Sequence, residues 1–218
     1  MRRNKARGKE GKMVLGIAGG VGSGKSTVLE ILQNRYQAYL CMADGLGHEA
    51  MRKGTGVHQK IVDEFGSAVL AEDGEIERNV LAGIVYREEE RLNILNAIIH
   101  PFVIQEIQRR MDECPGNRLF VLESAILFET GCDALCDVVW GVITETEIRI
   151  QRLMASRGYT RERAESIMTK QMGNAELAER CDGIVVNDGD RGELEQRISE
   201  LFGKMGWQSH INCDTIRE

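Results

Sequence analysis

The chain has 218 residues, of which 42% are hydrophobic and 28% charged, and its formal net charge is -6 at pH 7. This composition predicts a soluble globular protein with a substantial core, either as one domain or as a core with one or two small insertions. The first twelve residues hold six basic side chains against one acidic one, a net charge of +5, so residues 13–218 carry -11. An acidic body argues against general nucleic-acid binding, and no apolar run approaches the roughly 20 residues of a membrane span.

The two ends of the chain are predicted to be tails. Residues 1–12 form a basic, disordered extension in this interpretation, because they contain no apolar stretch and no amphipathic pattern, and Met13 is an alternative start. Periodicity is lost beyond Met205, and residues 207–218 are predicted to be a second tail. The six cysteines are scattered without a C-x-x-C pair, which is typical of reduced thiols and predicts a cytoplasmic location.

The first apolar run, Met13–Ala18, predicts a buried strand that leads into a glycine-rich loop. Residues 19–26 read Gly-Gly-Val-Gly-Ser-Gly-Lys-Ser and fit the pattern G-x-x-x-x-G-K-[ST]. In this pattern the glycines let backbone N–H groups face phosphate oxygens, the lysine supplies a charge, and the serine hydroxyl can bind Mg²⁺. A helix predicted to begin at Lys25 adds its positive end. The predicted nucleoside triphosphate site consists of Gly20, Val21, Gly22, Ser23, Gly24, Lys25, Ser26 and Thr27.

Four more apolar runs, each followed by polar or helical sequence, complete a predicted five-stranded parallel sheet. They are Ala38–Met42, Leu119–Leu122, Val138–Ile143 and Gly183–Val186. In such an α/β fold, ligands bind beyond the carboxyl ends of the strands. Residues just after the runs are therefore candidate site residues.

Two carboxylates occupy such positions. Asp44 closely follows the second run, where it is predicted to accept the proton of an acceptor hydroxyl or to hold Mg²⁺ through water; the alternative is a helix N-cap. Glu123 follows the third run. It is either part of a magnesium shell or an acceptor of nearby backbone hydrogen bonds, and both interpretations stay open.

A long insertion of about residues 45–117 separates the second and third runs and shows the periodicity of at least three helices. We interpret it as an acceptor-binding insertion. Pro101 is predicted to break its helical pattern after His100. By residue type alone, His100 is a packed or capping histidine and Arg78 a surface or turn residue.

A second insertion, predicted as two charged helices broken near Gly158, supplies a candidate lid at about residues 149–180. Arg149 and Arg152 share one helical face and are predicted to contact phosphate, whereas a solvated charged face is favoured for Arg157, Arg161 and Arg163. Gln171 and Met172 are interpreted as core or lid packing. The predicted domain over 13–206 thus has its core at 13–44, 118–148 and 181–206.

Several separate stretches between Met13 and Met205 resemble the dephospho-CoA kinase family. They are residues 16–27, 43–44, 65–66, 73–78, 95–96, 100–101, 123–131 and 149–157, with Gln171, Asp182 and 187–189. The resemblance implies the three-layer P-loop fold of nucleoside monophosphate kinases. It also implies an enzyme that uses MgATP to phosphorylate the ribose 3′-hydroxyl of dephospho-CoA, the last step of coenzyme A synthesis.

The resemblance also implies roles for single residues. Asp44 would be the general base and Arg149 or Arg152 would stabilise the transferring phosphoryl group. Asn187 and Gly189 would lie near the adenine of ATP, and the candidate substrate-binding residues are Arg78, His100 and Glu123. Two positions depart from the family: Met42 replaces its first aspartate, and Ala125-Ile126-Leu127 replaces a frequent Pro-Leu-Leu.

Two alternative functions stay open, a kinase for another small acceptor and a nucleotide-dependent switch. Against the switch, the sequence contains no Asn/Thr-Lys-x-Asp element for guanine recognition. We expect ATP and Mg²⁺ as cofactors, dephospho-CoA as substrate, no nucleic-acid or membrane partner, and a monomer or weak homo-oligomer.

Overall fold

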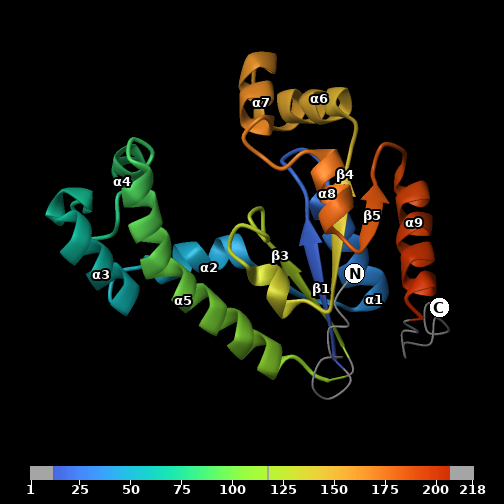
Figure 1. Ribbon diagram of the computed structural model, residues 1–218, viewed down its shortest axis with the longest axis horizontal. Coiled ribbons are helices and arrows are strands. Elements are labelled where there is room, and N and C mark those ends of the chain that lie inside the picture. Colours follow the sequence, from blue (N-terminus) through green and yellow to red (C-terminus); the bar gives the residue numbers. More distant parts are fainter. Residues whose placement is uncertain (1–11, 117, 207–218) are drawn as a thin grey trace. The chain divides into compact units, whose positions relative to one another are not determined.

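The computed structural model describes residues 12–116 and 118–206 (Figure 1). The predicted tails, apart from Lys12, lie outside the described residues. The chain divides into two compact units. The first unit comprises the described residues of Met1–Cys41 and Cys114–Glu218, and the second unit is Met42–Glu113.

The first unit is built on a five-stranded sheet, and this confirms the predicted α/β fold class. The strands are β1 (Met13–Ala18), β2 (Tyr39–Met42), β3 (Leu119–Glu123), β4 (Val138–Ile143) and β5 (Gly183–Val186), in the order β2-β3-β1-β4-β5. β1 is central and runs parallel to β3 and β4, and β4 runs parallel to β5. The carboxyl ends of these strands therefore share one edge of the sheet.

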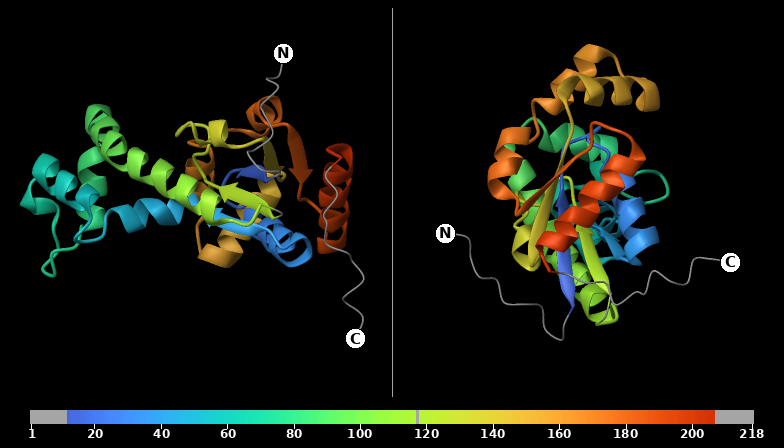
Figure 2. Two further views of the ribbon diagram at one scale, coloured as in Figure 1. Left: turned by 90° about the horizontal axis from the view of Figure 1, so that it is seen from below. Right: turned by 90° about the vertical axis from the view of Figure 1, so that its right-hand side faces the viewer.

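The first unit contains the helices α1 (Lys25–Tyr36), α6 (Thr146–Arg157), α7 (Arg161–Met168), α8 (Asn174–Arg180) and α9 (Arg191–Lys204). α1, α8 and α9 cover the faces of the sheet, whereas α6 and α7 lie beyond the end of β4 (Figure 1). Figure 2 shows α8 on one side of the sheet and α1 and α9 on the other. Phe202 of α9 lies 4.8 Å from Trp140 of β4 and 4.5 Å from Tyr36 of α1, measured between ring centroids, and so joins both helices to the sheet.

The predicted break at Gly158 is confirmed, since α6 ends there in a left-handed glycine with φ 62°. A third helix, α8, was not expected. It has only seven residues, too few to show a clear apolar repeat, and Leu177 is its buried residue.

The second unit consists of α2 (Ala43–Ala50), α3 (Gly56–Phe65), α4 (Arg78–Val85) and α5 (Glu89–Glu113). The prediction that Pro101 breaks the helix is wrong, because α5 runs through it for 25 residues. An interior proline costs about 3 kcal/mol, but Leu95 and Ile107 are buried on either side of it, and packing of this kind sustains a helix that local sequence disfavours. No described helix, α5 included, has the length and apolar character needed to cross a membrane.

Five of the six cysteines lie in the described part of the chain, and all five are buried free thiols: Cys41, Cys114, Cys132, Cys136 and Cys181. Burial in apolar surroundings disfavours the thiolate. It raises the pKa of Cys181 to about 12, and it also raises the pKa of Cys114 and of Cys132.

Candidate active site

The phosphate loop connects β1 to α1 at the carboxyl edge of the sheet. Gly22 and Gly24 have φ of 76° and 83°, values that favour glycine over residues with a side chain. Thr27 N–H donates to the carbonyl of Gly24 at 3.0 Å, so the N–H groups of Lys25 and Ser26 precede the first helical hydrogen bond. These donors and the positive end of α1 are suited to an anion, which makes the loop a candidate phosphate site.

Lys25 is held in place by two oxygens. Its Nζ donates to the carbonyl of Gly19 at 2.7 Å and lies 3.6 Å from Oε1 of Glu123. Glu123 is the last residue of β3, in register with Ile17 of β1, and only 5% of it is exposed. This ion pair is a contact that the sequence did not predict, and it orients the ammonium group before any nucleotide binds.

Arg149 of α6 lies against the tip of the loop. Its Nε donates to the carbonyl of Val21 at 2.9 Å, and only 5% of the residue is exposed. Burial lowers the pKa of Arg149, yet a guanidinium starts from so high a pKa that it stays charged at neutral pH. A Cβ at Gly20 would collide with Nη2 of Arg149, so any larger residue there would displace the guanidinium.

Arg152 lies one helical turn further along α6 and reaches the other side of the loop. Its Nη2 donates to the carbonyl of Asn187 at 3.0 Å, and the amide of Asn187 donates to the carbonyl of Ser23 at 2.8 Å. Nη1 of Arg152 and the hydroxyl of Ser23 are buried without a hydrogen-bond partner among the described residues. Buried donors of this kind are costly unless a ligand satisfies them.

Asn187 and Gly189, the predicted adenine residues, follow β5. The buried Asn187 belongs to the network beneath the loop: the Thr144 hydroxyl lies 3.0 Å from the carbonyl oxygen of Ser23 and 3.1 Å from that of Asn187, and it can donate its single proton to either. Gly189 is exposed, and a Cβ there would collide with the carboxylate of Glu193.

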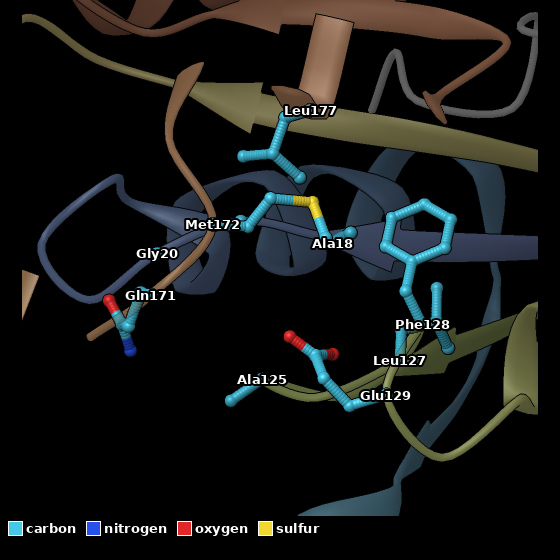
Figure 3. A pocket seen from close by; sticks show the side chains of 10 residues that line it. Ala18, Gly20, Ala125, Leu127, Phe128, Glu129, Gln171, Met172 and Leu177 are labelled. Atoms are coloured by element: carbon cyan, nitrogen blue, oxygen red, sulfur yellow. The ribbon is translucent and has the colours of Figure 1, made fainter. Parts of the chain in front are cut away.

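A pocket of about 270 Å³, its open mouth included, lies beside the phosphate loop. Its walls come from the end of β1, the segment 125–129, and the segment 171–177. Figure 3 shows the carboxylate of Glu129 pointing into this space, with Met172 and Leu177 on another side. Glu129 belongs to the family-like stretch 123–131, and the sequence predicts no role for it.

The other predicted site residues, Asp44, Arg78 and His100, belong to the second unit. Asp44 is exposed in the first turn of α2, and the helix N-cap is Met42, so the N-cap alternative for Asp44 is wrong. Arg78 is exposed at the start of α4, and His100 is half-buried within α5. Their roles in acceptor binding and catalysis stay predictions.

Oxygen donors for Mg²⁺ at the loop are the exposed Ser26 hydroxyl and the Glu123 carboxylate. Within residues 12–116 and 118–206, no three or more His, Cys, Asp or Glu side chains cluster as metal ligands. Mg²⁺ prefers oxygen, keeps several waters, and commonly binds through one or two protein groups plus substrate phosphates. The donor set therefore fits a magnesium ion that arrives with a nucleotide.

Comparisons with known proteins agree with one another. A family model described as dephospho-CoA kinase matches residues 13–193. A dephospho-CoA kinase of Geobacter sulfurreducens is 37% identical over 193 residues, and one of Lactobacillus johnsonii is 34% identical over 194; each match covers 88% of this chain and 98% of the relative. The crystal structure of TT1252 from Thermus thermophilus has a TM-score of 0.76 at 27% identity, covering 89% of this chain and 98% of that one.

Proposed function

We propose, on the premise that this chain belongs to the dephospho-CoA kinase family, that its phosphate loop and lid arginines bind ATP and transfer the γ-phosphoryl group. The enzyme is a phosphotransferase that acts on dephospho-CoA, with coenzyme A and ADP as products. The residue assignments rest on the position of Lys25, whose ammonium group is fixed between the carbonyl of Gly19 and the carboxylate of Glu123. A cation fixed beside a ring of backbone donors suits phosphate without further rearrangement.

Charge stabilisation is divided between the loop and α6. Phosphoryl transfer is accelerated mainly by positioning and by neutralising charge on the transferred group. Lys25 would bind phosphate oxygens of ATP. Arg152 is the better candidate for the transferring group, since its Nη1 has no acceptor within the described chain, whereas Arg149 already binds the loop.

Asp44 is the proposed general base. It would accept the proton of the ribose 3′-hydroxyl as that oxygen attacks phosphorus, and a carboxylate two residues beyond β2 follows the carboxyl end of a parallel strand. Arg78 and His100 are proposed to bind the acceptor. Magnesium, when bound, neutralises charge on the phosphates; Ser26 would hold it, with Asp44 or Glu123 contributing through water.

A cytoplasmic location and a monomeric or weakly associated state are further parts of the proposal. The first rests on the scattered cysteines, five of which are buried as free thiols. The second is best measured directly, by light scattering of the purified chain.

The test is ADP release from the purified chain with MgATP. Dephospho-CoA is compared with AMP, with adenosine and with no acceptor. We expect strong stimulation by dephospho-CoA alone and stoichiometric formation of coenzyme A. Equal or greater stimulation by AMP or adenosine would favour a kinase for another acceptor, and no stimulation by any acceptor would favour a nucleotide-dependent switch.

A further inference from the structure

Val21, at the tip of the phosphate loop, is held on both of its backbone polar groups by side chains of the lid segment. Its N–H donates to Oε1 of Gln171 at 2.8 Å, and its carbonyl accepts from Nε of Arg149 at 2.9 Å. The two side chains also meet, since Nη2 of Arg149 lies 3.5 Å from the same Gln171 oxygen. Three groups from distant parts of the chain therefore form one closed hydrogen-bonded unit.

The orientation of the Gln171 amide follows from its partners. A backbone N–H and a guanidinium are both donors, so the atom that they share must be the amide oxygen. The NH₂ group then lies on the other side of the amide, and Figure 3 shows it directed away from Gly20. Gln171 thus acts here as an acceptor, a property that an apolar side chain of similar length lacks.

Close packing at Gly20 leaves little free space between the phosphate loop and the side chains of Gln171 and Arg149. A Cβ on Gly20 would lie 3.0 Å from Oε1 of Gln171 and would collide with the guanidinium of Arg149. Gly20 does not have a positive φ, so its lack of a side chain serves this approach rather than a special backbone conformation.

We propose that Gln171 is a positioning residue that joins the lid to the phosphate loop. It fixes Val21 through the N–H group and orients Arg149 toward the carbonyl of the same residue, so the loop keeps its phosphate-binding shape while the segment between α7 and α8 stays in place. The proposal deepens the proposed kinase function and rests on it. It replaces the interpretation of Gln171 as a packing residue.

The test compares Gln171→Met, which keeps the side-chain length and loses the acceptor, with Gln171→Glu, which keeps an acceptor oxygen. Gln196→Met, on the exposed face of α9 where Gln196 bonds Glu200, is the matched control. The measurements are the amide hydrogen exchange rate of Val21 by NMR, the Kd of ADP by calorimetry, and KM and kcat with ATP.

We expect Gln171→Met to speed exchange of the Val21 amide at least tenfold and to raise the ADP Kd and the ATP KM by about five- to tenfold, the effect of losing one or two hydrogen bonds. Gln171→Glu should restore slow exchange, because the carboxylate also accepts from Val21 and Arg149. Gln196→Met should resemble the wild type in every measurement.

Slow Val21 exchange and an unchanged ADP Kd in Gln171→Met would overturn the proposal, even if the melting temperature fell, because a packing residue would behave in that way. Fast exchange in both Gln171 variants would also overturn it. If the wild type bound ADP but did not phosphorylate dephospho-CoA, while exchange followed the expected pattern, the kinase function would fail and the positioning role would stand.

Discussion

Arg149 and Arg152 of α6 and Arg109 of α5 are held by different kinds of acceptor. In the first unit, Arg149 and Arg152 donate to backbone carbonyls and to an amide oxygen, and neither has a carboxylate partner within the described residues. In the second unit, Arg109 donates to the carboxylates of Glu106 and Glu113 on its own helix, with 55% of its side chain exposed. Both sets are well ordered by hydrogen bonds, but only the second is neutralised.

The type of acceptor determines whether a cation can still attract and bind an anion. A carbonyl fixes the direction of a guanidinium without cancelling its charge, whereas a carboxylate removes most of its field. Lys25 is intermediate, since it has one carbonyl and one carboxylate partner. We therefore expect acceptor type to identify the phosphate-binding cations of this chain better than the number of basic residues in a segment does.

The largest expected effect comes from Lys25→Ala. Loss of a fixed charge should lower kcat by about 10²- to 10³-fold and weaken nucleotide binding by about tenfold, which together lower kcat/KM by about 10³- to 10⁴-fold. Steady-state kinetics measure the loss in kcat, and an ADP titration measures the loss in nucleotide binding. Lys60→Ala, on the exposed face of α3, is the control. An unchanged ADP titration in Lys25→Ala would contradict the phosphate-loop assignment.

Asp44→Asn should separate turnover from binding. Removing a general base is expected to lower kcat by on the order of 10³-fold, while ADP affinity changes little because the loop is intact. Single-turnover kinetics with dephospho-CoA measure the rate of phosphoryl transfer, and calorimetry measures the ADP affinity. Asp112→Asn, at an exposed position of α5, should match the wild type. A near-normal kcat in Asp44→Asn would assign the base to another residue.

Arg152→Ala and Arg109→Ala test the comparison most directly. The first should lower kcat by about 10²-fold, the usual effect of removing one preorganised donor. The second should leave kcat within about twofold, because its charge is already paired. The kcat of each variant is measured by steady-state kinetics with saturating ATP and dephospho-CoA. Equal losses of kcat in the two variants would show that the type of acceptor is not the distinguishing property.

The smallest effect concerns Glu106, whose pKa is lowered from 4.5 to about 2, chiefly by hydrogen bonds from Arg109 and Arg110. A lowered pKa stabilises the folded state above about pH 4.5, and that contribution disappears as the pH falls toward 2. Glu106→Gln should cost about 1 kcal/mol of unfolding free energy at pH 7, since these are surface pairs. Urea unfolding of both proteins should show the difference shrinking at acid pH; Glu72→Gln, at an exposed loop position, is the control.

Much of the fold follows from signals that lie within a few residues. The runs at Met13–Ala18, Val138–Ile143 and Gly183–Val186 form strands with the predicted bounds, because a strand buried on both faces is continuously apolar. Pro101 shows the limit of local rules. Packing of α5 outweighs a propensity that, in isolation, ends a helix.

The site was predicted in part, for a related reason. The phosphate loop is contiguous in sequence, so its pattern is visible there. Gln171 is separated from Val21 by 150 positions. Nothing in the sequence around a polar residue between two charged helices indicates so distant a partner. The Lys25 and Glu123 pair was hidden in the same way, although the phosphate-loop pattern made Lys25 a candidate and its position at a strand end made Glu123 one.

The buried cysteines have a practical consequence. With a pKa of about 12, Cys181 has on the order of one thiolate in 10⁵ molecules at pH 7, and only the thiolate attacks disulfides or alkylating reagents. A kinase whose acceptor and product both end in a thiol works among reactive sulfur compounds. The five described cysteines are protected from mixed disulfides by burial, and Cys181 is protected also by its low thiolate fraction.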